Sequence, residues 1–100
     1  MLQHNVYFYL KEGLSEKEIL QFETGLKSLL EINDMVSGFV GKPGKTADRP
    51  VVDKKYSYAL STTFHHVQQH DNYQDHPVHH KFINTCKDFW REVKVFDVEY

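Results

Sequence analysis

The sequence predicts a single α+β domain whose elements follow the order β-α-β-β-α-β. Three observations support this order: residues alternate with period two in several short segments, a capped amphipathic helix follows the first of them, and a helix that begins with proline follows the third. The 100 residues are the size of one domain, and 40% hydrophobic with 26% charged residues is an ordinary globular composition. We therefore expect residues 1–100 to form one domain around one core.

The first strand is predicted over residues 4–10, where side chains alternate between two faces. One face carries His4, Val6, Phe8 and Leu10, and the other carries Tyr7 and Tyr9. Because both faces are mostly apolar or aromatic, we expect both to be covered.

The first helix is predicted to begin at Ser15. Ser15 and Glu18 have the spacing of a capping box, in which the hydroxyl accepts a hydrogen bond from a helix N–H and the Glu side chain reaches back. Apolar residues then recur at helical spacing, at Ile19, Phe22, Leu26, Leu29 and Leu30.

A short second strand is predicted over residues 35–41, and a loop over residues 42–55. The loop contains Pro43, Gly44 and Pro50, and its five basic residues outnumber its two aspartates. It is interpreted as a solvated loop, with binding of an anionic ligand or of a partner chain as the alternative.

The third strand is predicted over residues 56–64, with large side chains on one face and small ones on the other. The large residues are Tyr56, Tyr58, Leu60, Thr62 and Phe64, and the small ones are Ser57, Ala59, Ser61 and Thr63. A face of small residues lets a second sheet approach closely.

A short helix, a second helix and a last strand are predicted to complete the chain. Apolar and aromatic residues step by three from Phe64 to Tyr73, and Pro77 suits the first position of the next helix. That helix carries a stripe of His79, Phe82, Ile83, Cys86 and Trp90, and residues 92–98 alternate again. Right-handed crossovers then give a ferredoxin-like fold, a four-stranded antiparallel sheet with helices on one face only.

The other face of this sheet is expected to meet a second copy of the chain. Its apolar residues are Tyr7, Tyr9, Phe39, Ala59, Val98 or their neighbours. An apolar patch of this kind is rarely left in water, and a two-fold dimer is the commonest way to cover it. The two sheets would then pack as a dimeric α+β barrel.

Charge and composition exclude several classes of partner. The formal net charge of −2 argues against a nucleic-acid partner, and no apolar stretch approaches the ~18 residues of a membrane span. Cys86 is the one cysteine, so no intramolecular disulfide forms, and we interpret it as a small buried hydrophobic residue. The first ten residues are typical of a strand rather than a signal peptide, so the expected location is the cytoplasm.

The segment between residues 65 and 80 is rich in histidine. His66 and His70 lie four residues apart, a spacing that can bind a transition metal on a helix. No cysteine or paired carboxylate completes a recognisable motif, so no metal site is predicted.

Five segments of the chain resemble the stress-responsive A/B-barrel (Dabb) family. They are His4-x-Val6-x-Phe8, Tyr56-Ser-Tyr58-Ala-Leu60, Tyr73-Gln-Asp-His76-Pro77-Val-His79, Phe89-Trp90 and Val95-Phe96-Asp97. The resemblance covers nearly the whole chain, and the Tyr-x-x-His-Pro-x-His segment is its most specific part. It implies a homodimer whose two sheets close into a barrel, with a pocket between sheet and helices in each protomer.

One plant branch of that family, which this chain resembles, cyclises a linear polyketide without any cofactor. The resemblance implies an acid/base pair at Tyr73 and His79 and pocket residues at His4 and Leu60. Two positions depart from that branch: Tyr58 stands where the cyclase has a histidine, and Leu26 where it has a pocket tyrosine. These departures bear on both the substrate and the reaction.

Tyr73 and His79 are the candidate catalytic residues, because reference pKa values of about 10 and about 6.5 suit proton donation by Tyr and abstraction by neutral His. If His76 caps the helix, the helix dipole disfavours a charged imidazole at His79. Ligand-binding side chains are predicted at His4, Val6, Phe8, Tyr58, Leu60 and Phe82. The alternative interpretation is that Tyr73, His79 and His4 are core or strand side chains with satisfied hydrogen bonds.

Three functions remain open at this point. The first is a homodimer that binds a small apolar or aromatic ligand in the pocket, with no cofactor. The second is an enzyme that uses Tyr73 and His79 for acid/base chemistry, such as cyclisation or isomerisation. The third is a structural or interaction dimer whose pocket is filled by Tyr58, Leu26 and Phe82.

Overall fold

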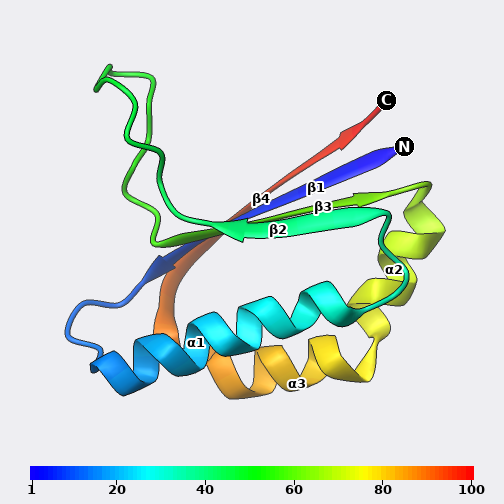
Figure 1. Ribbon diagram of the computed structural model, residues 1–100, viewed down its shortest axis with the longest axis horizontal. Helices are drawn as coiled ribbons and strands as arrows, with labels where there is room; N and C mark the ends of the chain where they lie inside the picture. The colour runs from blue at the N-terminus through cyan, green and yellow to red at the C-terminus, as the bar shows by residue number, and fades with distance from the viewer.

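A computed structural model describes all residues from 1 to 100 and has three helices on one face of a four-stranded sheet (Figure 1). The strands are antiparallel in the order β2-β3-β1-β4. Their bounds are Leu2–Leu10 for β1, Ser37–Gly41 for β2, Tyr58–Phe64 for β3 and Trp90–Glu99 for β4. The helices are α1 (Glu16–Ser28), α2 (Val67–Asp75) and α3 (Pro77–Cys86). This arrangement confirms the predicted α+β fold with a ferredoxin-like βαββαβ order.

Several element boundaries differ from the predicted ones. The strand β1 begins at Leu2 rather than at residue 4, and β3 begins at Tyr58 rather than at Tyr56. Trp90 opens β4 instead of extending the stripe of the last helix, because α3 ends at Cys86 and a 3-10 turn over Lys87–Phe89 separates it from the strand. Strand ends are less certain from sequence than strand interiors, because alternation weakens where pairing stops.

The two longer helices begin at side-chain caps. The Ser15 hydroxyl accepts from the Glu18 N–H at 3.1 Å, and the Glu18 carboxylate accepts from the Ser15 N–H at 3.0 Å. His76 caps α3 by accepting the Val78 N–H on Nδ1 at 3.1 Å, with Pro77 at the first helical position. Both predicted helix starts are therefore confirmed, and the His76 cap fixes His79 on the first turn of α3.

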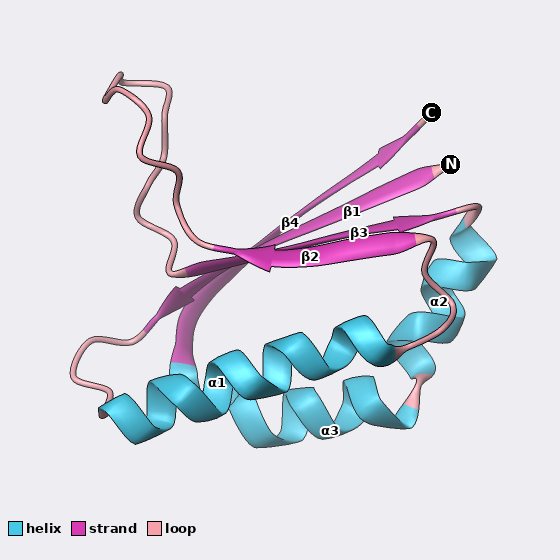
Figure 2. Ribbon diagram, viewed as in Figure 1, coloured by secondary structure: helices cyan, strands magenta, loops and turns pink.

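The core lies between the sheet and the helices (Figure 2). Its fully buried side chains come from both layers and include Phe22, Leu26, Leu29, Leu60, Phe64, Tyr73 and Cys86. The helices α1 and α3 pack closely at Gly25, where an added Cβ would lie 3.1 Å from the Cys86 Sγ. Cys86 is thus a buried thiol, as the sequence indicated.

The opposite face of the sheet carries no helix (Figure 2). Three of its large apolar side chains are exposed: Phe39 by 62%, Phe96 by 58% and Val98 by 52%. Strand pairing places Tyr7 beside Ala59 on β3 and beside Lys94 on β4. We call this surface the open face; it is the face on which the sequence placed Tyr7, Phe39, Ala59 and Val98.

Tyr56 is the exception among the predicted strand faces. It was assigned to the Tyr58 face, but its ring lies 5.1 Å from the ring of Tyr7, on the open face. The reason is that Tyr56 precedes the strand, so strict alternation does not govern its direction. Beside it the Tyr9 hydroxyl donates to the Asp53 carboxylate at 2.9 Å, so the long loop after β2 covers Tyr9.

That loop, over residues 42–57, extends on the side of the sheet away from the helices (Figure 1). Within it Lys54 pairs with Asp48 at 3.0 Å. None of the helices is both long and apolar enough to cross a membrane.

Candidate functional site

A cavity of about 240 Å³ lies on the helix side of the sheet, where β1 and β4 face α2 and α3. Ten of its thirteen lining residues are hydrophobic. The lining consists of His4, Val6, Phe8, Leu29, Leu60, Tyr73, Gln74, His79, Phe82, Ile83, Trp90, Val93 and Val95. We call it the helix-side cavity.

The local structure explains how these side chains meet. Alternation along β1 sends His4, Val6 and Phe8 to the helix face, and pairing with β4 sets Val95 beside Val6 and Val93 beside Phe8. The helix α2 supplies Tyr73 and Gln74 from its last turn, and α3 supplies His79, Phe82 and Ile83. Strands thus form the floor of the cavity and the two helices its roof.

Seven of the eight predicted site residues line this cavity, and Tyr58 does not. Tyr58 lies on the helix face but packs on Phe22 of α1, with ring centroids 5.5 Å apart. Its hydroxyl donates to the Glu23 carboxylate at 3.3 Å. Tyr58 is therefore on the predicted face but outside this cavity, because alternation gives the face of a side chain, whereas position along the strand decides which helix covers it.

Tyr73 has a buried hydroxyl with no hydrogen-bond partner in the protein. The residue is 0% exposed, and its ring packs on Phe64 with centroids 5.2 Å apart. Burial raises the pKa of the Tyr73 hydroxyl far above its ordinary value, so the group is a neutral donor. An unsatisfied buried hydroxyl at a cavity wall is a group that a ligand acceptor would satisfy.

His79 lies beside Tyr73, with ring centroids 5.0 Å apart and an angle of 77° between the planes. Burial lowers the pKa of His79 to about 4, and the nearby histidines His4, His80 and His70 lower it further. His79 is therefore neutral at pH 7 and offers a lone pair or an N–H to the cavity.

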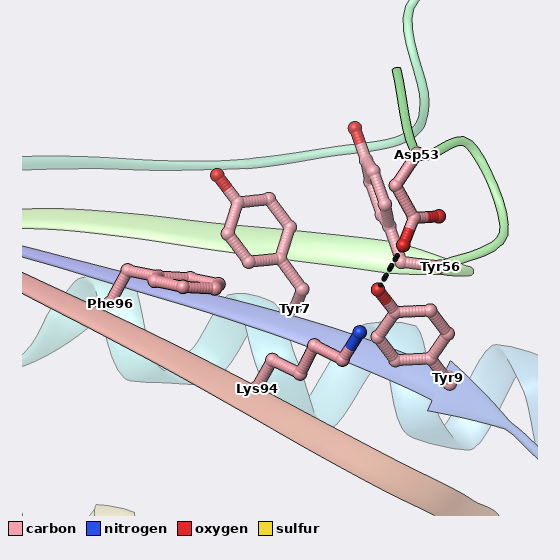
Figure 3. Close-up of a pocket in the computed structure, with 6 residues that line it drawn as sticks. All are labelled: Tyr7, Tyr9, Asp53, Tyr56, Lys94 and Phe96. Carbon is pink, nitrogen blue, oxygen red and sulfur yellow. Dashed lines mark hydrogen bonds between the residues drawn. The ribbon is translucent and has the colours of Figure 1, made fainter. Parts of the chain in front are cut away.

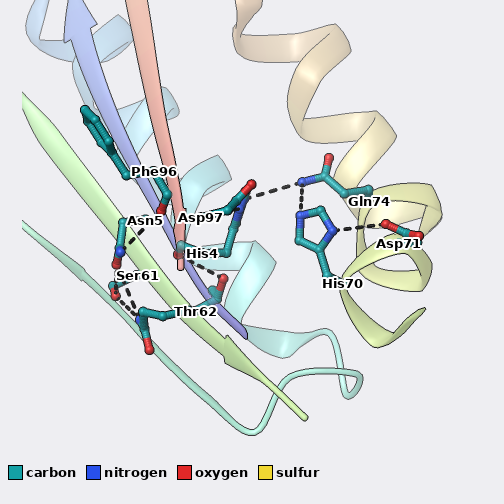
Figure 4. A network of polar contacts seen from close by, with 10 residues as sticks. His4, Asn5, Ser61, Thr62, His70, Asp71, Gln74, Phe96 and Asp97 are labelled. Atoms are coloured by element: carbon teal, nitrogen blue, oxygen red, sulfur yellow. Dashed lines mark hydrogen bonds and ion pairs between the residues drawn. The ribbon is translucent and has the colours of Figure 1, made fainter. Parts of the chain in front are cut away.

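His4 is 4% exposed and is held from both ring nitrogens (Figure 4). Its Nδ1 lies 2.5 Å from the Asp97 carboxylate, which pairing places opposite it on β4. Its Nε2 lies 3.4 Å from the Gln74 side-chain nitrogen. Burial lowers the pKa of His4, although the hydrogen bond to Asp97 opposes that shift. A neutral ring that donates Nδ1–H to Asp97 and accepts at Nε2 satisfies both contacts.

Gln74 and Asp97 are the polar site residues that sequence reasoning missed. Asp97 has a sequence signal, because alternation along β4 puts it on the same face as Val93 and Val95. Gln74 has none, since a glutamine on a short polar helix is usually solvated. The pair His66 and His70 does not converge: His66 caps α2 by accepting the Gln69 N–H, while His70 turns toward Gln74.

A second hollow, of about 350 Å³, lies on the open face (Figure 3). It is lined by Tyr7, Tyr9, Asp53, Tyr56, Lys94 and Phe96. The Tyr9 hydroxyl and the Lys55 N–H hold Asp53, and the Lys55 contact does most to lower the pKa of that carboxyl. The hollow lies on the face where a second copy of the chain is expected, so we interpret it as part of the dimer interface and not as a ligand site.

A family model described as the stress responsive A/B barrel domain matches residues 2–100. A comparison with curated proteins gives no match. Among solved structures, a Dabb family protein of Mesorhizobium loti with a ferredoxin-like fold has a TM-score of 0.77 and 22% identity. The match covers 99% of this chain and 95% of that chain.

Two further solved structures are similar over nearly the whole chain. A dimeric ferredoxin-like protein of unknown function from Thermobifida fusca has a TM-score of 0.77 and 18% identity, covering 99% of this chain and 90% of that chain. A hydroxynitrile lyase from Passiflora edulis has a TM-score of 0.76 and 22% identity, covering 97% of this chain and 90% of that chain. At these identities the similarity shows the fold.

Proposed function

The chain belongs to the stress responsive A/B barrel (Dabb) domain family, and on that premise we propose that it is a homodimer whose protomers each bind a small, mostly apolar or aromatic molecule in the helix-side cavity. The observation that carries the proposal is the cavity itself. It is largely apolar, and one of its lining residues is Tyr73, whose buried hydroxyl has no hydrogen-bond partner. Apolar walls with a few convergent polar groups are the usual composition of a small-molecule site.

The size of the cavity limits the ligand. An apolar cavity of roughly 150 Å³ is enough to hold benzene. The helix-side cavity, at about 240 Å³, therefore suits one substituted ring or a short chain. The polar groups on its wall favour a ligand with one or two acceptor atoms, one of which accepts from Tyr73.

Binding is favoured over acid/base catalysis by the protonation behaviour of the candidate pair. General acid/base groups work best when their pKa lies near the operating pH. Burial moves the pKa of Tyr73 upward and that of His79 down to about 4, so both move away from neutrality. The pair is better suited to hydrogen bonding with a bound molecule than to exchanging protons with it.

The second candidate function is a cofactor-free acid/base enzyme that uses Tyr73 and His79. It is favoured by the 5.0 Å separation of their rings and by the fold shared with a hydroxynitrile lyase. Assays for cyanide release from mandelonitrile and for cyclisation of a linear polyketide test it. Turnover that is lost in both Tyr73→Phe and His79→Ala would establish the enzyme and displace the binding protein.

Assembly through the open face is supported by two observations. The open face exposes Phe39, Phe96 and Val98, and the Thermobifida relative with the same fold is dimeric. The third possibility, a dimer without ligand, is favoured by a pocket filled by Tyr58, Leu26 and Phe82; of these, Phe82 lines the cavity, whereas Tyr58 and Leu26 do not.

The binding proposal is tested with benzaldehyde as probe and Trp90 as reporter. Trp90 is the one tryptophan of the chain and lines the helix-side cavity, so an occupant changes its fluorescence. We expect saturable quenching with a stoichiometry of one ligand per protomer. NMR shifts should then map to cavity residues and not to the open face.

A matched pair of variants makes this test specific. Val95→Phe adds a larger side chain to the lining of the cavity, and Val51→Phe makes the same change at an exposed loop position. We expect Val95→Phe to weaken benzaldehyde binding at least fivefold and Val51→Phe to leave it unchanged. Equal binding by both variants would place the benzaldehyde site outside the cavity and overturn the proposal. No saturable binding by a panel of small aromatic and aliphatic probes argues for the dimer without ligand.

A further inference from the structure

Two histidines from distant parts of the chain converge at the rim of the helix-side cavity. His4 comes from β1 and His70 from α2, and their ring centroids lie 4.6 Å apart (Figure 4). The Nε2 atoms of both rings lie 3.4 Å from the same atom, the side-chain nitrogen of Gln74. Two imidazole nitrogens therefore face one point.

Each of these rings has a carboxylate on its other nitrogen. His4 Nδ1 lies 2.5 Å from Asp97, and His70 Nδ1 lies 3.1 Å from Asp71. A carboxylate accepts the Nδ1–H and so leaves the lone pair on Nε2. Histidines that bind metals commonly donate their second N–H to a carboxylate in this way, which fixes both tautomer and ring direction.

The amide of Gln74 stands where a cation would bind. Its NH₂ group can donate one hydrogen to each Nε2, so a partial positive charge lies between two imidazole lone pairs. Rotating the amide by half a turn brings its oxygen to the same point as a ligand. One nitrogen of each histidine and one Asp97 oxygen also lie within 4.8 Å of one another, so small side-chain rotations bring the donors to metal-binding distances.

We propose that His4 Nε2 and His70 Nε2, with the side-chain oxygen of Gln74, bind one divalent transition-metal ion such as Zn²⁺ at the rim of the cavity. Imidazole nitrogens select Zn²⁺, Co²⁺, Ni²⁺ or Cu²⁺ over Mg²⁺ and Ca²⁺, which prefer oxygen ligands. Asp97 and Asp71 orient the rings and offset the charge of the ion.

The ion would lie next to the space that the proposed ligand occupies, because His4 and Gln74 line both. Solvent or an oxygen atom of the ligand would complete the coordination. The site does not depend on the binding proposal, since a metal can occupy the rim of an empty cavity. It also differs from the helical pair His66 and His70, because His66 is a helix cap.

The test is titration of the untagged, full-length protein with ZnCl₂ by calorimetry and with CoCl₂ by visible absorption. We expect one ion per protomer and a cobalt spectrum with nitrogen ligation. His70→Ala should weaken binding at least tenfold, and Asp71→Asn about tenfold, because loss of an orienting carboxylate typically costs that much. His80→Ala removes an exposed histidine from α3 and should leave the affinity unchanged.

His70 packs on Phe64, with ring centroids 5.6 Å apart, so His70→Gln serves as a second variant that keeps more of the packing. Circular dichroism confirms that each variant is folded before titration. Absence of saturable uptake by the parent protein overturns the site. Binding that survives both His70 variants, or that His80→Ala weakens equally, overturns it in favour of surface histidines. Benzaldehyde titration of His70→Ala reports separately on the cavity, so failure of the metal site and failure of the ligand site are distinguishable.

Discussion

At the scale of single residues, the Tyr73 hydroxyl gives the best reason to interpret the cavity as a binding site rather than as part of a packed core. A buried hydroxyl without a partner costs about 1–3 kcal/mol, because its hydrogen bonds to water are lost and not replaced. The protein retains this group on Tyr73, a residue that lines an apolar cavity. A core position with no ligand to satisfy would be better served by phenylalanine.

Tyr73→Phe should therefore stabilise the protein and weaken its discrimination between ligands. We expect the free energy of unfolding to rise by about 1 kcal/mol in urea titration. The parent should bind benzaldehyde about fivefold more tightly than toluene, which has the ring without the acceptor, and Tyr73→Phe should bind both equally. Tyr58→Phe is the control. The Tyr58 hydroxyl donates to Glu23, so removing it should not stabilise the protein. Destabilisation by Tyr73→Phe would mean that the hydroxyl is satisfied within the protein.

His79 gives the protein a specific dependence on pH. Its pKa is lowered from 6.5 to about 4 by burial, so between those values the unfolded chain binds a proton that the folded chain does not. The contribution of His79 to the free energy of unfolding should therefore be complete above pH 6.5 and should decrease as the pH falls. From pH 7 to pH 5 this one group should lower the free energy of unfolding by about 2 kcal/mol. His4, whose pKa is also lowered, acts in the same direction.

Urea unfolding at pH 7 and pH 5 measures this loss. His79→Gln should reduce the loss, leaving the contribution of His4, and His80→Gln at an exposed position should not change it. An identical loss in His79→Gln and the parent would show that His79 titrates as an exposed histidine does.

At the scale of elements, the cap of α3 links stability to the site. His76 accepts the Val78 N–H, and this contact fixes the first turn of α3, which carries His79. His76→Ala should lower the free energy of unfolding by about 1 kcal/mol, whereas His76→Asn, a good N-cap, should retain it. Thermal unfolding measures the effect of each variant on stability, and benzaldehyde affinity measures its effect on the site. Equal values for the Ala and Asn variants would show that the cap contributes little.

Periodicity and caps predicted the elements well, because both are local properties of the chain. Two local signals, the capping box at Ser15 and the proline at position 77, predicted where helices begin. The alternation along β1 and β3 predicted which face of the sheet each side chain occupies. What they lack is the lateral position of a side chain between helices. For this reason Tyr58 was assigned to the cavity, although the helix that covers it is α1. For the same reason Gln74 was missed, because it contacts His4 from a position 70 residues later in the chain.

At the scale of the whole molecule, the open face has the composition of a surface that packs against another protomer. Beside its exposed apolar residues, four polar side chains bond to one another: Gln3 donates to Ser61 at 2.6 Å, Ser61 donates to Asn5 at 2.7 Å, and Thr63 donates to Gln3 at 2.6 Å. Polar groups that are already satisfied within one protomer cost little to bury against another. The surface is therefore compatible with a dry sheet-to-sheet contact.

Ala59→Arg tests whether a second copy covers this face. Ala59 lies on the inner strand β3, paired with Tyr7 and Gly41 on the open face, so an arginine there would place an unpaired charge between two sheets. We expect the dimer to weaken at least a hundredfold in sedimentation velocity. Leu20→Arg adds the same charge on the exposed side of α1 and should leave the dimer intact. An Ala59→Arg protein that stays dimeric with unchanged stability would place the interface elsewhere, and the exposed edge strand β4 would then be the next surface to test.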